Sequence, residues 1–222
     1  MGMLYLVRHG QASFGAANYD QLSDLGQRQC QRLGKYFRDR GQRFDAVVRG
    51  SLQRHAQSLQ GIVDGYGGLP AETVHPALNE YDSAAVLRTV HPEALEAPRT
   101  HEAYKAHFRL LREGLQAWMD GRVAPEGMPS YADFVGGIQT VLTQLRESHQ
   151  GDVLMVSSGG PIATAVGGVL GAPAHSTIEL NMRIRNSAIT EFSATRHHYV
   201  LHSFNHLPHL DAREFADWVT YT

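Results

Sequence analysis

Mostly apolar runs and helix-like spacings alternate along this 222-residue chain. Short apolar runs, typical of buried strands, occur at residues 4–7, 44–48 and 153–156. Each run is followed by a segment in which apolar positions recur every three or four residues, as on one helix face: 25–37, 52–63 and 162–170. A strand followed by a helix, repeated along the chain, predicts an α/β domain with a mainly parallel sheet.

The remaining patterns complete the expected fold. Residues 72–77 predict a short edge strand, and residues 185–194 and 199–205 predict a terminal strand pair. The helical pattern over 25–37 and a further one that follows Ser130 begin just after serines that are typical N-caps, Ser23 and Ser130. We therefore expect one domain over residues 1–222, a three-layer α/β/α sandwich with a mainly parallel sheet, an antiparallel edge strand and a helical lid insertion.

Residues 83–129 are the expected lid, because they depart from the alternation of strands and helices. Prolines at 92 and 98 interrupt this segment, and a strongly amphipathic helix follows over residues 102–119. Insertions in α/β folds often cover the site, so we expect this segment to set the choice of substrate. The pattern leaves open which of its candidate polar contacts face inward: His91, Arg99, His101 and Lys105.

Composition narrows the classes of function. A formal net charge of −2 and a pI near 6.7 do not favour a nucleic-acid or anionic membrane partner, so a basic site must be local. The chain has one cysteine, Cys30, and no apolar run long enough to span a membrane. The first strand begins too early for a signal peptide, and Leu6 does not fit a myristoylation motif. We expect a cytoplasmic protein, and the oligomeric state is open.

The first candidate chemistry follows the first strand, where Arg8, His9 and Gly10 stand in succession. Open α/β sheets bind ligands at the carboxyl ends of their strands. Arginine is suited to hold an anion, histidine to act as a nucleophile or base, and glycine to let the backbone come close. This combination favours a phosphate ligand. The alternative is a strand that ends in a surface arginine and a hydrogen-bonded histidine without a ligand. Only further motifs along the chain can distinguish these two interpretations.

Two further segments are expected at the same sheet edge. With Ser51 as N-cap, Arg54 falls in the first turn of the helix after the second strand, where the helix N-terminus already favours anions. The third strand runs into Ser157-Ser158-Gly159-Gly160, a small-residue turn at another helix N-terminus. A strand, a small-residue turn and a helix N-terminus together favour phosphate binding, here without the lysine of a P-loop.

Thirteen histidines raise the question of a metal site. The nearest approach to a ligand cluster is His202, His206 and His209, across a strand end and a proline-containing loop. No carboxylate or thiolate stands at ligand spacing beside them. We therefore expect neither a metal nor another cofactor.

Taken in order, these motifs resemble the histidine phosphatase superfamily, which includes the phosphoglycerate mutases. The resemblance is carried by five segments spread over most of the chain: 8–10, 22–27, 51–54, 78–80 and 157–160. It implies that His9 is the nucleophile, that Arg8 and Arg54 hold the phosphoryl oxygens and that Glu80 gives a proton to the leaving group. Along the substrate it places Gln11, Ser13 and Gly159.

One position departs from the family pattern. The family usually has a second histidine before the Gly-Gly of the later strand, and this chain has Ser158 there. Serine is a neutral and poorer partner for developing negative charge. Three outcomes are open: an active enzyme that uses Ser158 and the helix N-terminus, a slow enzyme, or a phosphate-binding relative without activity. His55 could supply an imidazole, but as the neighbour of Arg54 it is expected to point elsewhere on the helix.

The sequence therefore predicts a metal-independent phosphatase that acts on a small phosphomonoester through a phosphohistidine at His9. The alternative of another class is a protein that binds a phosphorylated ligand without turning it over. A mutase is disfavoured, because residues 78–81 lack the basic and glycine residues of the mutase loop and Gly15 replaces an asparagine. Which phosphomonoester is bound stays open.

Overall fold

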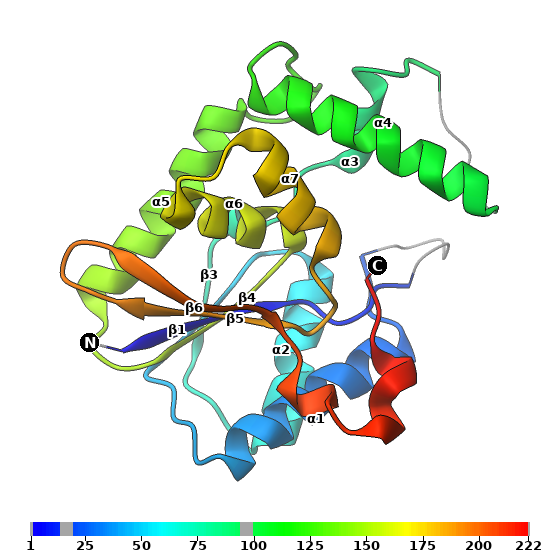
Figure 1. The fold of residues 1–222 in the computed structure, drawn as a ribbon. Helices are drawn as coiled ribbons and strands as arrows, with labels where there is room; N and C mark the ends of the chain where they lie inside the picture. Colours follow the sequence, from blue (N-terminus) through cyan, green and yellow to red (C-terminus); the bar gives the residue numbers. More distant parts are fainter. Residues whose placement is uncertain (1, 14–19, 94–99, 222) are drawn as a thin grey trace.

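The computed structural model describes residues 2–13, 20–93 and 100–221. A six-stranded sheet in the order β3-β2-β4-β1-β5-β6 forms the centre of this part of the chain (Figure 1). Its strands are β1 (Met3–Arg8), β2 (Ala46–Arg49), β3 (Glu72–Val74), β4 (Val153–Ser157), β5 (Ile189–Ala194) and β6 (Tyr199–His206).

The first four strands run parallel, since β4 pairs parallel with both β1 and β2, and β2 pairs parallel with β3. β5 pairs antiparallel with β1, and β6 pairs antiparallel with β5. The mainly parallel sheet is thus confirmed. The reversed strand is β5, one place in from the edge strand β6, so the edge strand itself is antiparallel only to its neighbour.

Helices cover both faces of this sheet, as expected for three layers (Figure 1). On one face α1 (Asp24–Asp39) and α2 (Gln53–Tyr66) pack closely against each other. On the other lie α5 (Tyr131–Ser148) and α6 (Gly159–Leu170). The shorter elements are α3 (Ser83–Arg88), α7 (Ala174–Arg183) and the 3-10 helices η1 (Pro76–Leu78), η2 (Pro208–Leu210) and η3 (Arg213–Trp218).

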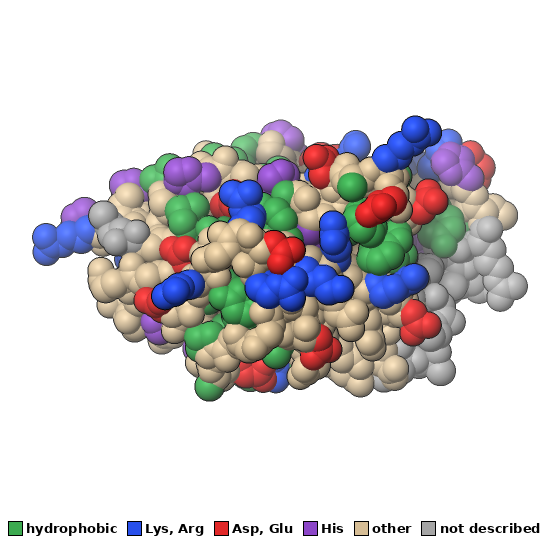
Figure 2. All heavy atoms as spheres, turned by 90° about the horizontal axis from the view of Figure 1, so that it is seen from below, with side chains coloured by type: hydrophobic (Ala, Val, Ile, Leu, Met, Phe, Trp, Pro, Cys, Tyr) green, Lys and Arg blue, Asp and Glu red, His purple; other side chains and the backbone are tan. Residues whose placement is uncertain are grey.

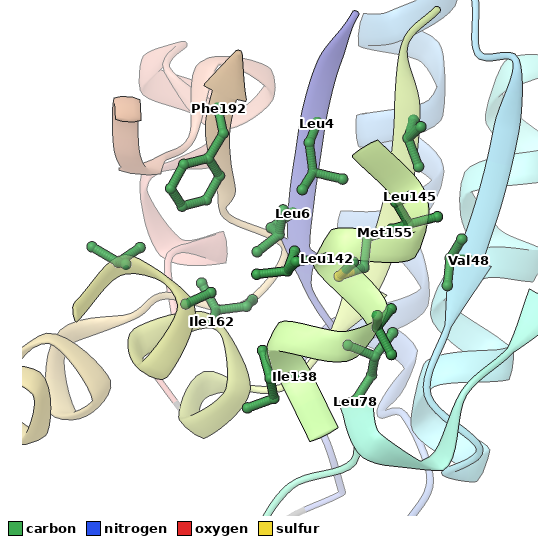
Figure 3. Packing of buried hydrophobic residues seen from close by; sticks show 14 of the residues in the cluster. Leu4, Leu6, Val48, Leu78, Ile138, Leu142, Leu145, Met155, Ile162 and Phe192 are labelled. Carbon is green, nitrogen blue, oxygen red and sulfur yellow. The ribbon is translucent and has the colours of Figure 1, made fainter. Parts of the chain in front are cut away.

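The apolar patterns of strands and helices meet in two cores, one on each face of the sheet. Figure 3 shows the core beneath α5 and α6, where Leu6 and Met155 from the sheet face Leu142 and Ile162 from the helices. The core beneath α1 and α2 includes Val7, Leu33, Phe37, Ile62 and Val156. Removing such apolar surface from water is the main force that holds the layers together.

Local capping matches the sequence for two helices and differs for a third. The hydroxyls of Ser23 and Ser130 accept backbone hydrogen bonds at the starts of α1 and α5, as predicted. The prediction that Ser51 caps α2 is wrong, because Leu52 is the N-cap and offers no side-chain acceptor. The Asp20 carboxylate accepts instead from the backbone N–H groups of Gln53 (2.9 Å) and Arg54 (3.4 Å).

The expected lid segment contains α3 and α4 (His101–Met119). These helices pack with α7 around a separate apolar cluster that includes Val86, Leu115, Trp118 and Ile178. Figure 1 shows α4 on the far side of α7 from the sheet. Of the predicted polar contacts, His101 and Lys105 are exposed, and Arg99 lies outside the described residues. The assignment of this segment as a lid stays a prediction.

The C-terminal η3 packs on the outer surface of α1 through two cation–π contacts. Arg28 lies 5.0 Å from the ring centre of Trp218, and Arg32 lies 4.5 Å from that of Phe215. On the face shown in Figure 2, basic and acidic side chains are interspersed rather than separated into fields of one sign. No helix in the described part of the chain has the length and apolar character needed to cross a membrane.

Buried neutral histidines give the fold a dependence on pH. His209 is 2% exposed, its Nε2 lies 2.9 Å from Ser187 Oγ, and burial lowers its pKa to about 3. The unfolded chain binds a proton at this histidine near pH 6.5, whereas the folded chain does not. Its contribution to stability is therefore complete above about pH 6.5 and is lost as the pH falls toward 3, by about 1.4 kcal/mol per pH unit.

We expect His209→Gln to flatten this dependence by that amount per pH unit, because one proton fewer is taken up on unfolding. The measurement is the free energy of unfolding in urea at several pH values between neutral and mildly acidic. His197→Gln is the matched control, since His197 is exposed. An identical pH slope in His209→Gln and the unsubstituted protein would rule out a buried neutral His209.

Candidate active site

The candidate site lies where the parallel strands end. Arg8 at the end of β1 pairs in register with Ser157 at the end of β4, and the N–H of His9 donates to the Ser157 carbonyl (2.9 Å). The N–H of Gly50, just after β2, donates to the Val156 carbonyl (3.1 Å). Three strands therefore end side by side, which brings the segments that follow them to one edge of the sheet.

His9 is held as a neutral imidazole with a defined tautomer. Its Nδ1 lies 2.7 Å from the Gly10 carbonyl oxygen, which can only accept a hydrogen bond, so Nδ1 carries the proton and Nε2 a lone pair. Burial lowers the pKa of His9 well below its usual value, and the positive charges of Arg8 and Arg54 lower it further. Neutral Nε2 is the nucleophilic form of histidine.

Gly10 is required at its position because of close backbone approach. A Cβ there would collide with the Gly26 carbonyl oxygen at the start of α1. The Gly10 N–H donates to Ser58 Oγ (3.0 Å), and that hydroxyl donates in turn to the Arg54 carbonyl (2.7 Å). The loop after β1 is thereby tied to the first turns of α1 and α2.

Both predicted phosphate-binding arginines lie at this edge and are mostly buried. Arg8 donates through Nη1 to the backbone carbonyls of Ile184 and Tyr221. Arg54 forms an ion pair through Nη1 with Asp20 (2.8 Å). Both guanidinium charges lower the pKa of His9 and oppose the rise in the pKa of Glu80. The two guanidinium groups are therefore close enough to His9 and Glu80 to influence both side chains electrostatically.

Glu80 lies at the N-terminus of α6. Its carboxylate accepts from the Gly160 N–H through Oε1 (3.0 Å) and Oε2 (3.2 Å), and from the Tyr81 N–H (3.3 Å). A Cβ at Gly160 would collide with Oε1, so glycine is needed for this contact. Burial raises the pKa of Glu80, while the Gly160 N–H and the charges of Arg54 and Arg8 oppose that rise. A raised pKa favours a carboxyl group that can give up a proton near neutral pH.

The expectation that His55 points away from the site is wrong. His55 Nε2 lies 2.7 Å from Ser158 Oγ, and neither side chain is exposed to solvent. The ring centres of His55 and His9 are 5.8 Å apart. Arg54 and His55 both reach the site because they stand in the first turn of α2, whose N-terminal end faces the strand ends. The sequence did contain a signal, since His55 precedes Leu59 by four residues and Ile62 by seven, on the buried face of the helix.

The other predicted contacts line the same loops. Gln11 Oε1 accepts from Ser23 Oγ (2.8 Å), and the Ser13 N–H donates to the Gln21 carbonyl (2.8 Å). Gly159 packs against Asn181, whose amide donates to the Tyr81 hydroxyl (2.8 Å). That these groups contact substrate stays a prediction, and Gly15, used in the mutase comparison, lies outside the described residues.

Two residues that hold the site together, Asp20 and Asn79, were not predicted from the sequence. Asp20 caps α2 and binds Arg54 at once, from a loop more than thirty positions earlier in the chain. Asn79 Oδ1 accepts from the Ser51 N–H, and its amide donates to Ser51 Oγ, both at 2.7 Å. These contacts join the loop that carries Glu80 to the loop that precedes Arg54. Spacing along the chain carries no signal for either.

Among the described residues, no group of three or more histidine, cysteine or acidic side chains could hold a metal ion. The histidines considered for this role have other neighbours. His202 Nε2 lies 2.9 Å from Ser193 Oγ, and His209 is buried against Ser187.

The sequence is similar to a known protein family and to two known enzymes. The model of the histidine phosphatase superfamily (branch 1) matches residues 4–207. A 2,3-bisphosphoglycerate-dependent phosphoglycerate mutase of Allorhizobium ampelinum is 35% identical over 88 residues, which cover 36% of this chain. The corresponding enzyme of Rhizobium meliloti is 34% identical over 88 residues. Each match spans only 42% of the length of the mutase.

Solved structures agree in fold over nearly the whole chain. A mycobacterial glucosyl-3-phosphoglycerate phosphatase is 21% identical with a TM-score of 0.67, covering 93% of this chain and 99% of its own. A phosphoserine phosphatase of Entamoeba histolytica, in complex with 3-phosphoglyceric acid, is 22% identical with a TM-score of 0.66. That match covers 95% of this chain and 100% of the other.

Proposed function

The chain belongs to the histidine phosphatase superfamily, and from this premise we propose that it hydrolyses phosphomonoesters through a phosphohistidine at His9, without a metal. The observation that carries the proposal is the hydrogen bond from Nδ1 of His9 to the Gly10 carbonyl, which leaves the Nε2 lone pair free to attack. Two buried arginines beside it supply the positive charge that a phosphoryl group needs.

In the first step His9 Nε2 attacks phosphorus as the bond from phosphorus to the ester oxygen breaks. Arg8 and Arg54 neutralise charge on the equatorial oxygens, and guanidinium forks suit this task better than ammonium groups. The departing alkoxide takes a proton from the Glu80 carboxyl group. The products of this step are an alcohol, phosphohistidine and the Glu80 carboxylate.

In the second step the Glu80 carboxylate takes a proton from a water molecule as that water attacks phosphorus. The bond from phosphorus to Nε2 breaks, inorganic phosphate leaves and neutral His9 is restored. Covalent capture thus divides one hard displacement into two easier ones. The raised pKa of Glu80 suits a group that must be acid in one step and base in the next.

Two of the compared structures support phosphomonoester hydrolysis as the class of reaction, since they are a glucosyl-3-phosphoglycerate phosphatase and a phosphoserine phosphatase. The curated mutases favour a second candidate, transfer of the phosphoryl group to another hydroxyl. Because the matched part covers 42% of their length, we place this candidate second.

A third candidate is a protein that binds a phosphorylated ligand without turnover, and the serine at position 158 favours it. Neutral serine is a weaker partner for charge on a phosphoryl group than an imidazolium. An assay of turnover and intermediate together separates a hydrolase from such a binder.

We expect clear hydrolysis of p-nitrophenyl phosphate in the presence of a chelator. Rapid quenching with radiolabelled substrate is expected to trap a phosphoprotein that is labile in acid and stable in base, as phosphohistidine is. Label mapped to the peptide containing His9 supports the proposal. No turnover and no label, in folded protein that still binds inorganic phosphate, would establish the binding protein. Turnover lost on chelation would contradict metal independence.

We also propose the cytoplasm as the compartment of this protein. Cys30 is the chain's one cysteine and is fully buried, and burial raises the pKa of its thiol to about 11. A reduced, unreactive thiol of this kind fits a reducing compartment.

A further inference from the structure

Ser158 stands at the N-cap of α6 but does not cap the helix with its side chain. An N-cap serine normally accepts a hydrogen bond from the N–H of the second or third helical residue. Here the second residue is Gly160, whose N–H is bound by Glu80, and the third is Pro161, which has no N–H. The Ser158 hydroxyl is therefore available for a different partner.

That partner is the imidazole of His55. The 2.7 Å contact between Nε2 and Oγ joins two side chains with no exposed surface. The hydroxyl and the ring lie beside His9, because Ser158 follows the strand residue that binds the His9 backbone and the two imidazole centres are 5.8 Å apart. This buried polar pair therefore lies beside the imidazole that is proposed to attack the phosphoryl group.

The direction of the hydrogen bond depends on which ring nitrogen of His55 carries the proton. Phosphoryl oxygens only accept, so the Ser158 hydroxyl can bind one only if its own oxygen accepts from Nε2–H of His55. With the proton on Nε2, Nδ1 has none. This nitrogen lies against Gly50, whose backbone opposes the lowering of the His55 pKa, and it forms no hydrogen bond of normal geometry with the described residues. A buried acceptor without a partner is tolerated better than a buried N–H.

We propose that His55 orients the Ser158 hydroxyl as a hydrogen-bond donor to the transferring phosphoryl group. Ser158 is then a catalytic residue and His55 a positioning residue. Burial, Arg54 and Arg49 lower the pKa of His55 to about 3, so its ring is neutral in the resting protein and acts through its single N–H. This inference rests on the proposed phosphatase reaction.

The test is a double-mutant cycle on Ser158→Ala and His55→Leu, with kcat for p-nitrophenyl phosphate and the affinity for vanadate as readouts. Each single change is expected to lower kcat by roughly 10²-fold, as loss of one preorganised donor does. If His55 acts through Ser158, the double variant loses about as much as either single one. Independent roles would multiply to roughly 10⁴-fold, and that result would overturn the proposal.

His55→Gln is the conservative variant, because its amide places an N–H near the position of Nε2. We expect it to keep most of the activity that His55→Leu loses, with little change in KM for either. Ser157→Ala is the matched control, since this neighbouring buried serine donates to the Leu78 carbonyl and not to His55. Its effect should be independent of His55→Leu. Far-ultraviolet circular dichroism and thermal unfolding show whether each variant folds.

The outcomes distinguish this inference from the proposed reaction. If the unsubstituted protein has no turnover, the phosphatase proposal fails, and the cycle on vanadate affinity still decides whether the pair acts as one donor. If the unsubstituted protein turns over substrate and the losses of kcat in Ser158→Ala and His55→Leu are independent, only the proposed coupling of His55 to Ser158 is overturned. Trapped phosphate on Ser158 instead of His9 would overturn the positioning role, since the serine would then be the nucleophile activated by His55.

Discussion

Replacing His9 with alanine is expected to lower kcat for p-nitrophenyl phosphate by roughly 10⁴-fold or more, the largest effect of any single change in this protein. Loss of a covalent nucleophile removes the low-barrier route altogether, and comparable losses accompany removal of nucleophiles in other hydrolases. The variant lacks the Nε2 lone pair that the Gly10 carbonyl orients. The measurement is steady-state hydrolysis, together with trapping of labelled phosphoprotein.

Binding should survive this substitution. Arg8 and Arg54 are held by backbone carbonyls and by Asp20, and neither needs the imidazole for its position. Calorimetry with inorganic phosphate is therefore expected to give an affinity close to that of the unsubstituted protein. His197→Ala is the control, since His197 is exposed. Unchanged hydrolysis in His9→Ala would exclude the phosphohistidine route, whatever the result for binding.

Glu80→Gln is expected to have the second largest effect, and one that depends on the leaving group. An alkoxide leaves only with a proton, so kcat for phosphoserine or glycerol phosphate should fall by roughly 10²–10⁴-fold. Nitrophenolate is a weak base that leaves without a proton, so formation of the phosphohistidine from p-nitrophenyl phosphate should change far less. The measurement is single-turnover kinetics with both kinds of substrate.

The pH dependence should change with the same substitution. The first step needs the protonated Glu80, whose pKa is raised chiefly by burial, so turnover of alkyl phosphates is expected to fall as the pH rises through that value. In Glu80→Gln this alkaline fall should disappear, because the amide does not titrate. Glu179→Gln, which removes an exposed carboxylate paired with Arg112, is the control. Equal losses for both leaving groups would show that Glu80 is not the proton donor.

The difference between expectation and structure is clearest at His55. Sequence spacing suggested that neighbours on a helix point in different directions, and along most of a helix this separates their environments. In the first turn of α2 the helix end itself faces the strand ends, so Arg54 and His55 reach one site from adjacent sides. The position of the helix axis decides this, and a linear pattern does not contain it.

The capping of α2 also differs from what local sequence rules predict. Ser51 fits a sequence rule for N-caps, yet its hydroxyl accepts from the Asn79 amide and the cap comes from Asp20. Local rules predict an acceptor at the helix start, because the free N–H groups there require one. They do not say from which part of the chain that acceptor comes.

By itself, the sequence determined the alternation of strands and helices, the mainly parallel sheet and the group of residues after the strands. Strands buried on both faces must be apolar throughout, and parallel strands end at one edge, so periodicity alone indicates that the segments with His9 and Ser158 lie at the same edge. Only the tertiary structure decided the His55 contact with Ser158, the Asp20 contact with Arg54 and the place of Glu80 on Gly160. These are directed contacts between distant segments, and their geometry exists only once the layers have packed.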